Sequence, residues 1–304
     1  MPLHPQAQAF LDAIAEQNPP GWNEMTPDQG REIFASFGQL FGEGPELDRV
    51  EDQTIPGGVN IRIFSNAAAE TQPAVIYFHG GGWVLGNVQT HDALCRRIAK
   101  ASDCTVISVD YALAPEDKFP KPLEDCYLAT QHVANHAADL GIDPGKIAVA
   151  GDSAGGNLAA AVTIKARDQA GPTIKFQLLI YPVIEPNFET ESYRQFAEGH
   201  GLSRLVMQWF WKQYISDAAP GPLAAPCTAE TLQGLPAAHV ITAEYDVLRD
   251  EGEAYAEQLR AAGVPTTAKR YHGNLHGFIH FAEMFDDGIK ATDDLAQILK
   301  AQLN

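Results

Sequence analysis

A serine flanked by two glycines constrains the fold of this chain more than any other feature. Residues Gly151 to Gly155 read Gly-Asp-Ser-Ala-Gly and follow the apolar run Lys146 to Ala150, which predicts a buried strand. The Ala-rich segment Asn157 to Arg167 comes next and predicts a helix. A serine on a sharp turn between a strand and a helix is typical of a nucleophile elbow, where glycines permit close packing. The pattern predicts that Ser153 lies at the carboxyl end of a parallel strand.

Strand-like runs recur along the chain, with helical stretches between most of them. The runs are residues 59–64, 74–78, 105–109, 146–150, 176–181, 239–242 and 267–271. This alternation predicts an α/β fold with a mostly parallel central sheet and helices on both faces. Pro56, Gly57 and Gly58 precede the first run and are typical of a hairpin turn. The sheet is therefore expected to begin antiparallel.

A glycine-rich segment follows the predicted strand at residues 74–78. It reads His79-Gly80-Gly81-Gly82-Trp83, and successive glycines let backbone N–H groups approach a ligand closely. Preorganised N–H donors stabilise the negative oxygen of a tetrahedral intermediate, and HGGG segments contribute to this oxyanion hole in lipases and esterases. We predict that the oxyanion donors are the N–H groups of Gly81, Gly82 and Ala154.

A serine nucleophile needs a base that removes its proton, and in this arrangement the base is a histidine late in the chain. The histidines after Ser153 are His200, His239, His272, His276 and His280. His276 is predicted to be the base because it follows the strand-like residues 266–271 in a loop that has a glycine on its far side. His272 is the alternative. His239 lies inside a strand-like run and is expected to be a core or edge residue.

The acid that orients the base should follow the preceding strand, at residues 240–243. Asp246 is predicted to be this acid, since it comes directly after that strand. Asp250 and Glu251 are typical of an N-cap and a first-turn charge for the next helix. Glu244 is expected to be solvated or to support the site indirectly.

These segments together resemble a known family. Residues 79–82 (HGGG), 151–157 (GDSAGGN), 246–250 (DVLRD) and 276–278 (HGF) are similar to the bacterial hormone-sensitive lipase-like carboxylesterases, in the branch with Asp before the nucleophile. The match runs from the HGGG strand to the last helix. The resemblance implies an α/β-hydrolase fold with a helical cap. Ala112 stands where Arg is commoner in the family, which affects a local ion pair and leaves the triad untouched.

Composition bounds the remaining possibilities. A chain of 304 residues can bury a full core in a single domain. Residues 1–20 lack a signal-peptide pattern, and no run approaches the roughly 18 apolar residues of a membrane span, so a cytoplasmic location is predicted. The net charge of −18 argues against nucleic acid and anionic membranes as partners. The four cysteines lack metal spacing and are expected to be free, so neither a metal nor a cofactor is expected.

Two segments are predicted to form a helical cap on this single α/β-hydrolase domain. They are the N-terminal helices at 1–45 and an insertion at 186–222, in which Ser203 can cap an aromatic-rich helix. Bulky side chains in the cap favour a pocket of limited volume. The sequence thus predicts a serine carboxylesterase acting on small-molecule esters with short-to-medium acyl chains. Alternatives are an amidase, an arylformamidase or an acetyl-hydrolase, or a non-catalytic small-molecule receptor. A homodimer is one alternative for the assembly.

Overall fold

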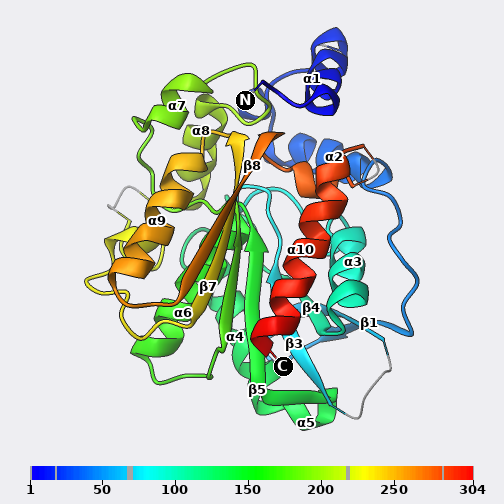
Figure 1. The fold of residues 1–304 in the computed structure, drawn as a ribbon, viewed down its shortest axis with the longest axis vertical. Helices are drawn as coiled ribbons and strands as arrows, with labels where there is room; N and C mark the ends of the chain where they lie inside the picture. Colours follow the sequence, from blue (N-terminus) through cyan, green and yellow to red (C-terminus); the bar gives the residue numbers. More distant parts are fainter. Residues whose placement is uncertain (1, 18, 67–70, 217–219, 283, 304) are drawn as a thin grey trace.

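The computed structural model describes residues 2–17, 19–66, 71–216, 220–282 and 284–303, and it is built on one eight-stranded sheet (Figure 1). The strand order is β1-β2-β4-β3-β5-β6-β7-β8. The strands are β1 Arg49–Thr54, β2 Asn60–Ser65, β3 Gln72–Phe78, β4 Thr105–Asp110, β5 Ile142–Asp152, β6 Phe176–Ile180, β7 Ala237–Tyr245 and β8 Thr266–Leu275.

The sheet begins antiparallel and continues parallel, as predicted. β2 pairs antiparallel with both β1 and β4, whereas every pairing from β4 through β3 to β8 is parallel. The β1–β2 turn contains Gly57 and Gly58 with φ of 99° and 84°, a left-handed region that favours glycine. β1 is missing from the predicted strands because its sequence, RVEDQT, is mostly exposed and carries no apolar run.

Helices cover both faces of the sheet (Figure 1). They are α1 Pro5–Gln17, α2 Pro27–Ser36, α3 Asp92–Ser102, α4 Lys121–Asn135, α5 Ala137–Leu140, α6 Ala154–Asp168, α7 Glu191–Gln195, α8 Arg204–Tyr214, α9 Arg249–Ala261 and α10 Asp286–Leu303. Short 3₁₀ helices are η1 Trp22–Glu24, η2 Phe37–Gln39, η3 Pro226–Thr228 and η4 Phe278–His280. Apolar side chains of α4, α6 and α9 fill the core on one face, and those of α3 and α10 fill it on the other.

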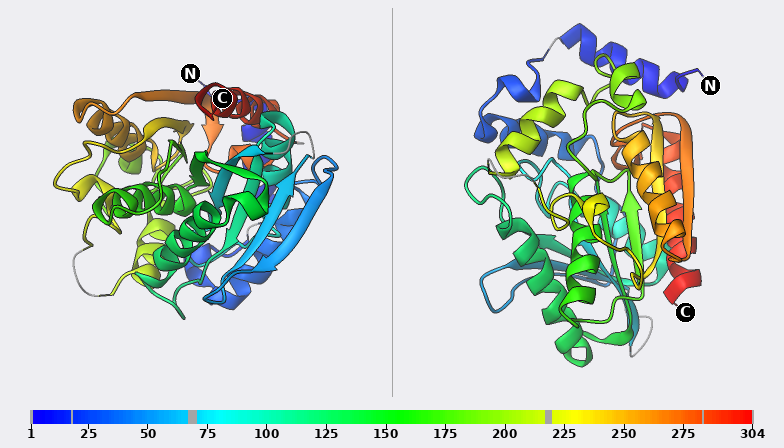
Figure 2. Two further views of the ribbon diagram at one scale, coloured as in Figure 1. Left: turned by 90° about the horizontal axis from the view of Figure 1, so that it is seen from below. Right: turned by 90° about the vertical axis from the view of Figure 1, so that its left-hand side faces the viewer.

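Helices α1, α2, α7 and α8 gather at the end of the molecule to which the arrows of β7 and β8 point (Figures 1 and 2). The Ser203 hydroxyl caps α8 as predicted, accepting a hydrogen bond from the N–H of Val206 at 3.2 Å. Phe210, Trp211 and Tyr214 are buried, but Leu205 is 56% exposed, so α8 is not buried all round. Residues 1, 18 and 217–219 of the two predicted cap segments lie outside the described residues.

The structure also bears on membrane-spanning helices and on the state of the cysteines. None of the helices in the described ranges combines the length and apolar character needed to cross a bilayer. The cysteines are free, as predicted, with Cys95, Cys104 and Cys126 buried and Cys227 partly buried.

Candidate active site

Ser153 occupies a strained turn between β5 and α6. Its φ of 54° and ψ of −117° are unusual for a residue with a side chain, and such conformations cost on the order of 1–3 kcal/mol. The surrounding backbone holds this turn, because the Ser153 N–H donates to the Ile180 carbonyl at 2.9 Å and the Ser153 carbonyl accepts from Val183 at 3.1 Å. The structure thus has the geometry of a nucleophile elbow.

The two flanking glycines are required by close approach. A Cβ on Gly155 would lie 1.9 Å from the Phe78 carbonyl oxygen, and one on Gly151 would lie 2.4 Å from the Gly155 carbonyl group. Both distances are shorter than any real Cβ contact. The start of α6 therefore packs directly on the end of β3, which brings the elbow next to the glycine-rich segment.

His276 lies against the serine. Its Nε2 is 3.0 Å from the Ser153 hydroxyl oxygen, at the distance of a hydrogen bond. His276 directly follows β8, and Gly277 with φ of 81° turns the chain into η4. The alternative, His272, is 52% exposed and its Nδ1 lies 3.2 Å from the Glu244 carboxylate. The structure therefore brings His276, rather than His272, to Ser153.

Asp246 completes the chain of contacts. Its Oδ2 is 2.7 Å from Nδ1 of His276, and its Oδ1 accepts the N–H of Leu248 at 2.9 Å. The carboxylate is buried. An Nδ1–H that donates to the Asp246 carboxylate leaves the lone pair of Nε2 facing the Ser153 hydroxyl.

The acidic residues after Asp246 behave differently from the sequence prediction. Leu248 is the N-cap of α9, so the predicted N-cap role of Asp250 is wrong, although Asp250 and Glu251 do lie in the first turn. Glu251 is buried, and its Oε1 accepts the Ile184 N–H at 2.7 Å. Burial raises the pKa of the Glu251 carboxyl well above its usual value, and the nearby Glu185 and Asp246 add to the rise.

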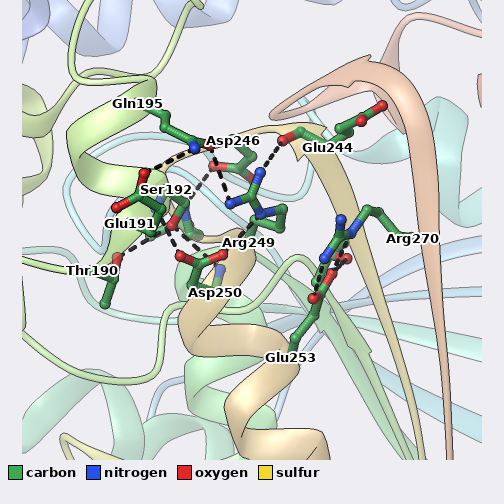
Figure 3. Close-up of polar contacts among 12 residues, drawn as sticks. Thr190, Glu191, Ser192, Gln195, Glu244, Asp246, Arg249, Asp250, Glu253 and Arg270 are labelled. Carbon is green, nitrogen blue, oxygen red and sulfur yellow. Dashed lines mark hydrogen bonds and ion pairs between the residues drawn. The ribbon is translucent and has the colours of Figure 1, made fainter. Parts of the chain in front are cut away.

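Helix α7 contacts the loop that carries Asp246 (Figure 3). The Ser192 hydroxyl donates to the Val247 carbonyl at 2.6 Å, and the Ser192 N–H donates to the Asp250 carboxylate at 2.7 Å. Arg249 spans the same loop, because its guanidinium donates to the Glu244 carbonyl at 3.1 Å and lies 5.2 Å from the Phe196 ring. Residues of the predicted cap insertion therefore clamp the acid loop.

The predicted oxyanion donors lie on the two glycine-rich turns. Gly81 and Gly82 have φ of 111° and 60°, which glycine adopts readily. In the part of the chain that the structure describes, the N–H groups of Gly81, Gly82 and Ala154 donate to no protein acceptor. The Gly80 N–H differs, since it donates to the Asp152 carboxylate at 3.0 Å. The N–H groups of Gly81 and Gly82 therefore lack an acceptor among the described residues, as the predicted role in an oxyanion hole requires.

Helix α8 closes over the same segment. A Cβ on Gly82 would lie 2.2 Å from the Phe210 ring, and the Trp83 ring stacks on Tyr214 with centroids 4.1 Å apart. Trp83 is fully buried in this stack. Its side chain therefore packs the segment against α8.

Comparison with known proteins identifies the family. A family described as having the alpha/beta hydrolase fold matches residues 75–280, which is more than half of the chain. The chain belongs to the alpha/beta hydrolase family. The fold class and the family that the motifs predicted are both confirmed.

Relatives of this hydrolase share most of its length. An arylesterase from Saccharolobus solfataricus is 39% identical over 292 residues, covering 92% of this chain and 93% of the relative. The carboxylic ester hydrolase LipN from Mycobacterium tuberculosis is 41% identical over 274 residues, covering 86% and 73%. A hyperthermophilic esterase from Pyrobaculum calidifontis superposes with a TM-score of 0.94 at 44% identity, covering 99% of each chain.

One cluster in this hydrolase was missed by the sequence analysis. His91, Asp152 and His280 lie together and buried beneath the elbow, with one ligand-type atom from each within 4.8 Å of the others. In the sequence, Asp152 stands in the elbow motif and His280 among the histidines after the serine, and neither position indicates a buried cluster. His280 and Asp152 are 128 residues apart in the sequence, so no local sequence pattern predicts their contact.

Proposed function

We propose that this hydrolase is a serine carboxylesterase that cleaves short-to-medium acyl esters through an acyl-enzyme on Ser153. The class of carboxylic ester hydrolase, predicted from the motifs, is confirmed by relatives named arylesterase, carboxylic ester hydrolase and carboxylesterase. The observation that carries the proposed mechanism is the chain of contacts from Ser153 through His276 to Asp246, at 3.0 and 2.7 Å.

The proposed reaction has two halves. Nε2 of His276 takes the hydroxyl proton as the Ser153 oxygen attacks the ester carbonyl carbon, while Asp246 stabilises the imidazolium. The carbonyl oxygen becomes an anion, which the N–H groups of Gly81, Gly82 and Ala154 are placed to receive. The C–O bond to the alcohol breaks, and His276 protonates the leaving oxygen. Water then gives a proton to His276 as its oxygen attacks the acyl carbon. The bond from that carbon to the Ser153 oxygen breaks, His276 returns the proton to the serine oxygen, and the acid is released.

Labelling with a fluorophosphonate tests this assignment. The reagent phosphonylates an activated serine, so wild-type protein should be labelled at Ser153 and lose activity in step. Ser153→Ala should keep the fold, resist labelling and lose on the order of 10⁴ to 10⁶ in kcat. Near-normal ester hydrolysis by Ser153→Ala would refute the mechanism. An unlabelled but ligand-binding wild type would favour the receptor alternative.

The proposed acyl-length limit rests on α8. Phe210 lies against Gly82, and Trp211 and Tyr214 pack with Trp83 directly beside the predicted oxyanion donors. Each extra methylene of an acyl chain gains about 0.8 kcal/mol only while apolar space remains. A series of p-nitrophenyl esters should show the highest kcat/KM at short-to-medium acyl length. A preference for emulsified long-chain triglycerides would contradict this limit.

The proposal also covers the cap, the partner and the location of the protein. Residues 1–45 and 186–222 are proposed to act as the cap, which fits the gathering of α1, α2, α7 and α8 at one end of the sheet (Figure 1). A small-molecule ester is the partner that the relatives support. A cytoplasmic location, the absence of nucleic-acid binding and a homodimer stay predictions. The amidase, arylformamidase and acetyl-hydrolase alternatives are not favoured.

A further inference from the structure

The proposed chemistry leaves one buried charged residue without a role. Asp152 directly precedes Ser153, and its side chain is only 5% exposed. A buried carboxylate is costly unless donors satisfy its oxygens. Here Oδ1 accepts the Tyr77 hydroxyl at 2.7 Å and the Gly80 N–H at 3.0 Å, and Oδ2 lies 3.0 Å from Nε2 of His280.

The neighbouring histidines favour the ionised form of Asp152. Burial by itself would raise the pKa of the Asp152 carboxyl, but the interactions of this carboxyl with His91 and His280 outweigh burial and hold its pKa well below the usual value. The carboxylate is therefore a strong, fixed acceptor at the pH where an esterase works.

A cation is one occupant to consider for His91, Asp152 and His280. The Gly80 N–H argues against it, because this one group donates both to Asp152 at 3.0 Å and to Nε2 of His91 at 3.2 Å. The hydrogen therefore lies between two of the three atoms that would have to bind the ion. The donor set instead fits an acceptor that holds a backbone segment.

The segment it holds is the one with the predicted oxyanion donors. Gly80 immediately precedes Gly81 and Gly82, and a Cβ on Gly80 would lie 2.2 Å from Oδ2 of Asp152. The other side of the segment is fixed by the Tyr111 hydroxyl, which donates to the His79 carbonyl at 2.6 Å. One carboxylate therefore sets the distance between the nucleophile turn and the N–H groups that face the substrate.

We propose that Asp152, held by His280, is a positioning residue that fixes the oxyanion segment relative to Ser153 through its hydrogen bond with the Gly80 N–H. This inference rests on the proposed function. It predicts that loss of the acceptor weakens binding of the transition state and leaves ground-state binding of the ester largely intact.

The test compares Asp152→Ala and Asp152→Asn with wild type. An alkyl trifluoromethyl ketone, which forms a tetrahedral adduct on an active serine, reports on the oxyanion site, and p-nitrophenyl butyrate gives kcat and KM. Asp152→Ala should lower kcat by about 10²- to 10³-fold, which is the cost of losing one oxyanion donor. The ketone Ki should weaken by a similar factor, with KM changed less than about threefold. Asp152→Asn keeps an acceptor for Gly80 and should stay within about tenfold of wild type.

Tyr77→Phe is the matched control, since it removes a donor to the same carboxylate oxygen without touching Gly80. Its kcat and ketone Ki should stay within about threefold of wild type, whatever it does to Tm. The proposal would be overturned if Tyr77→Phe lowered kcat and weakened the ketone Ki as much as Asp152→Ala does. It would also be overturned if Asp152→Asn were as impaired as Asp152→Ala. In either case the cluster would act only through the stability of the fold.

Two further arms keep the test decisive. If Asp152→Ala does not fold, His280→Ala replaces it, with an expected fall in kcat of about tenfold and a matching change in ketone Ki; an unchanged Ki would overturn the proposal.

Fluorophosphonate labelling of wild type separates the proposed function from this inference. Failure to label wild-type Ser153 counts against the proposed function, whereas labelled wild type with an unaffected Asp152→Ala counts against this inference alone.

Discussion

The serine turn and the loops that carry Asp246 and His276 are held in place in different ways. Around Ser153, backbone packs on backbone, with glycine the only residue that fits at positions 151 and 155. The loop that carries Asp246 instead depends on contacts with α7. The loop that carries His276 depends on contacts with the N-terminal segment. The turn at Ser153 is thus fixed by close backbone packing, whereas the loops that carry Asp246 and His276 are held by contacts with α7 and with the N-terminal segment.

The histidine loop illustrates the second mode. The His4 N–H donates to the Gly273 carbonyl at 2.9 Å, three residues before His276. The Phe41 ring lies 5.1 Å from Phe281 and 5.4 Å from His280, centroid to centroid. The N-terminal segment therefore packs on both sides of the proposed base.

The largest effect is expected where backbone meets backbone. Gly155→Ala should yield little folded protein, because overpacking costs about 1–3 kcal/mol in ordinary cores and more where the neighbour is a backbone carbonyl 1.9 Å away. Thermal unfolding followed by circular dichroism measures this. Gly38→Ala is the control, since nothing lies within 4 Å of a Cβ there. A Gly155→Ala protein with wild-type Tm would show that the elbow is less tightly packed than the structure indicates.

Removal of residues 1–41 should damage activity more than the sheet. The deletion takes away His4 and Phe41, so the His276 loop loses its support while the strands keep their pairings. We expect kcat/KM to fall by at least about 100-fold, as small misplacements of catalytic groups can produce, with the far-ultraviolet circular dichroism spectrum largely preserved. Full activity after the deletion would refute the inference that the N-terminal segment supports the His276 loop.

A point substitution sharpens the same question. Phe41→Ala should cost about 3 kcal/mol of stability, the usual range for a buried phenylalanine, and should lower kcat. Leu40→Ala is the neighbouring control, since Leu40 is 45% exposed and its truncation should change neither. Equal behaviour of the two variants would show that Phe41 contributes nothing specific to the histidine loop.

The clamp on the acid loop predicts a smaller effect. Ser192→Ala removes the hydrogen bond to the Val247 carbonyl and frees the loop next to Asp246, so kcat should fall about tenfold with little change in KM. Ser203→Ala, in the same predicted cap insertion, removes only the cap of α8 and should cost about 1 kcal/mol of stability with kcat unchanged. If Ser203→Ala lowers kcat as much as Ser192→Ala, the effect is general to the cap.

The difference between these regions explains how much of the site the sequence could predict. Ser153, the HGGG segment and the histidine followed by glycine are local patterns, because each residue's neighbours in the chain determine its geometry. The Ser192 clamp and the contacts of His280 join residues that lie far apart, and no spacing rule connects them. The N-cap of α9 was missed for a related reason, since Asp250 is used by Ser192 of a distant helix and Leu248 takes the capping position.

The last prediction concerns pH and compares two buried histidines, His79 and His239. Burial lowers the pKa of His79, beside the oxyanion segment, to about 3, and that of His239, on β7, to about 4. Both fall below the unfolded value of about 6.5, so their contribution to stability is present above pH 6.5 and is lost as the pH falls. Each should lower the free energy of unfolding by up to about 1.4 kcal/mol per pH unit between about pH 6 and 4.

His239→Asn isolates one of these contributions. Urea unfolding at pH 7, 6 and 5 should give a slope for the variant that is shallower than for wild type by up to about 1.4 kcal/mol per pH unit. Other titrating groups are common to both proteins and cancel. Identical slopes would mean that His239 does not stay neutral in the folded protein.

The contact between Phe210 and Gly82 has a consequence for how the substrate range of such an enzyme can evolve. The same ring bounds the space beside the oxyanion segment and supports the backbone of that segment. A mutation that shortens Phe210 to admit larger substrates therefore also disturbs the proposed oxyanion donors. Selection for larger substrates should first find changes at exposed cap positions such as Leu205, which lies outside the aromatic packing around Gly82. Substitutions that change the substrate range should therefore be tolerated better at exposed cap residues than at Phe210.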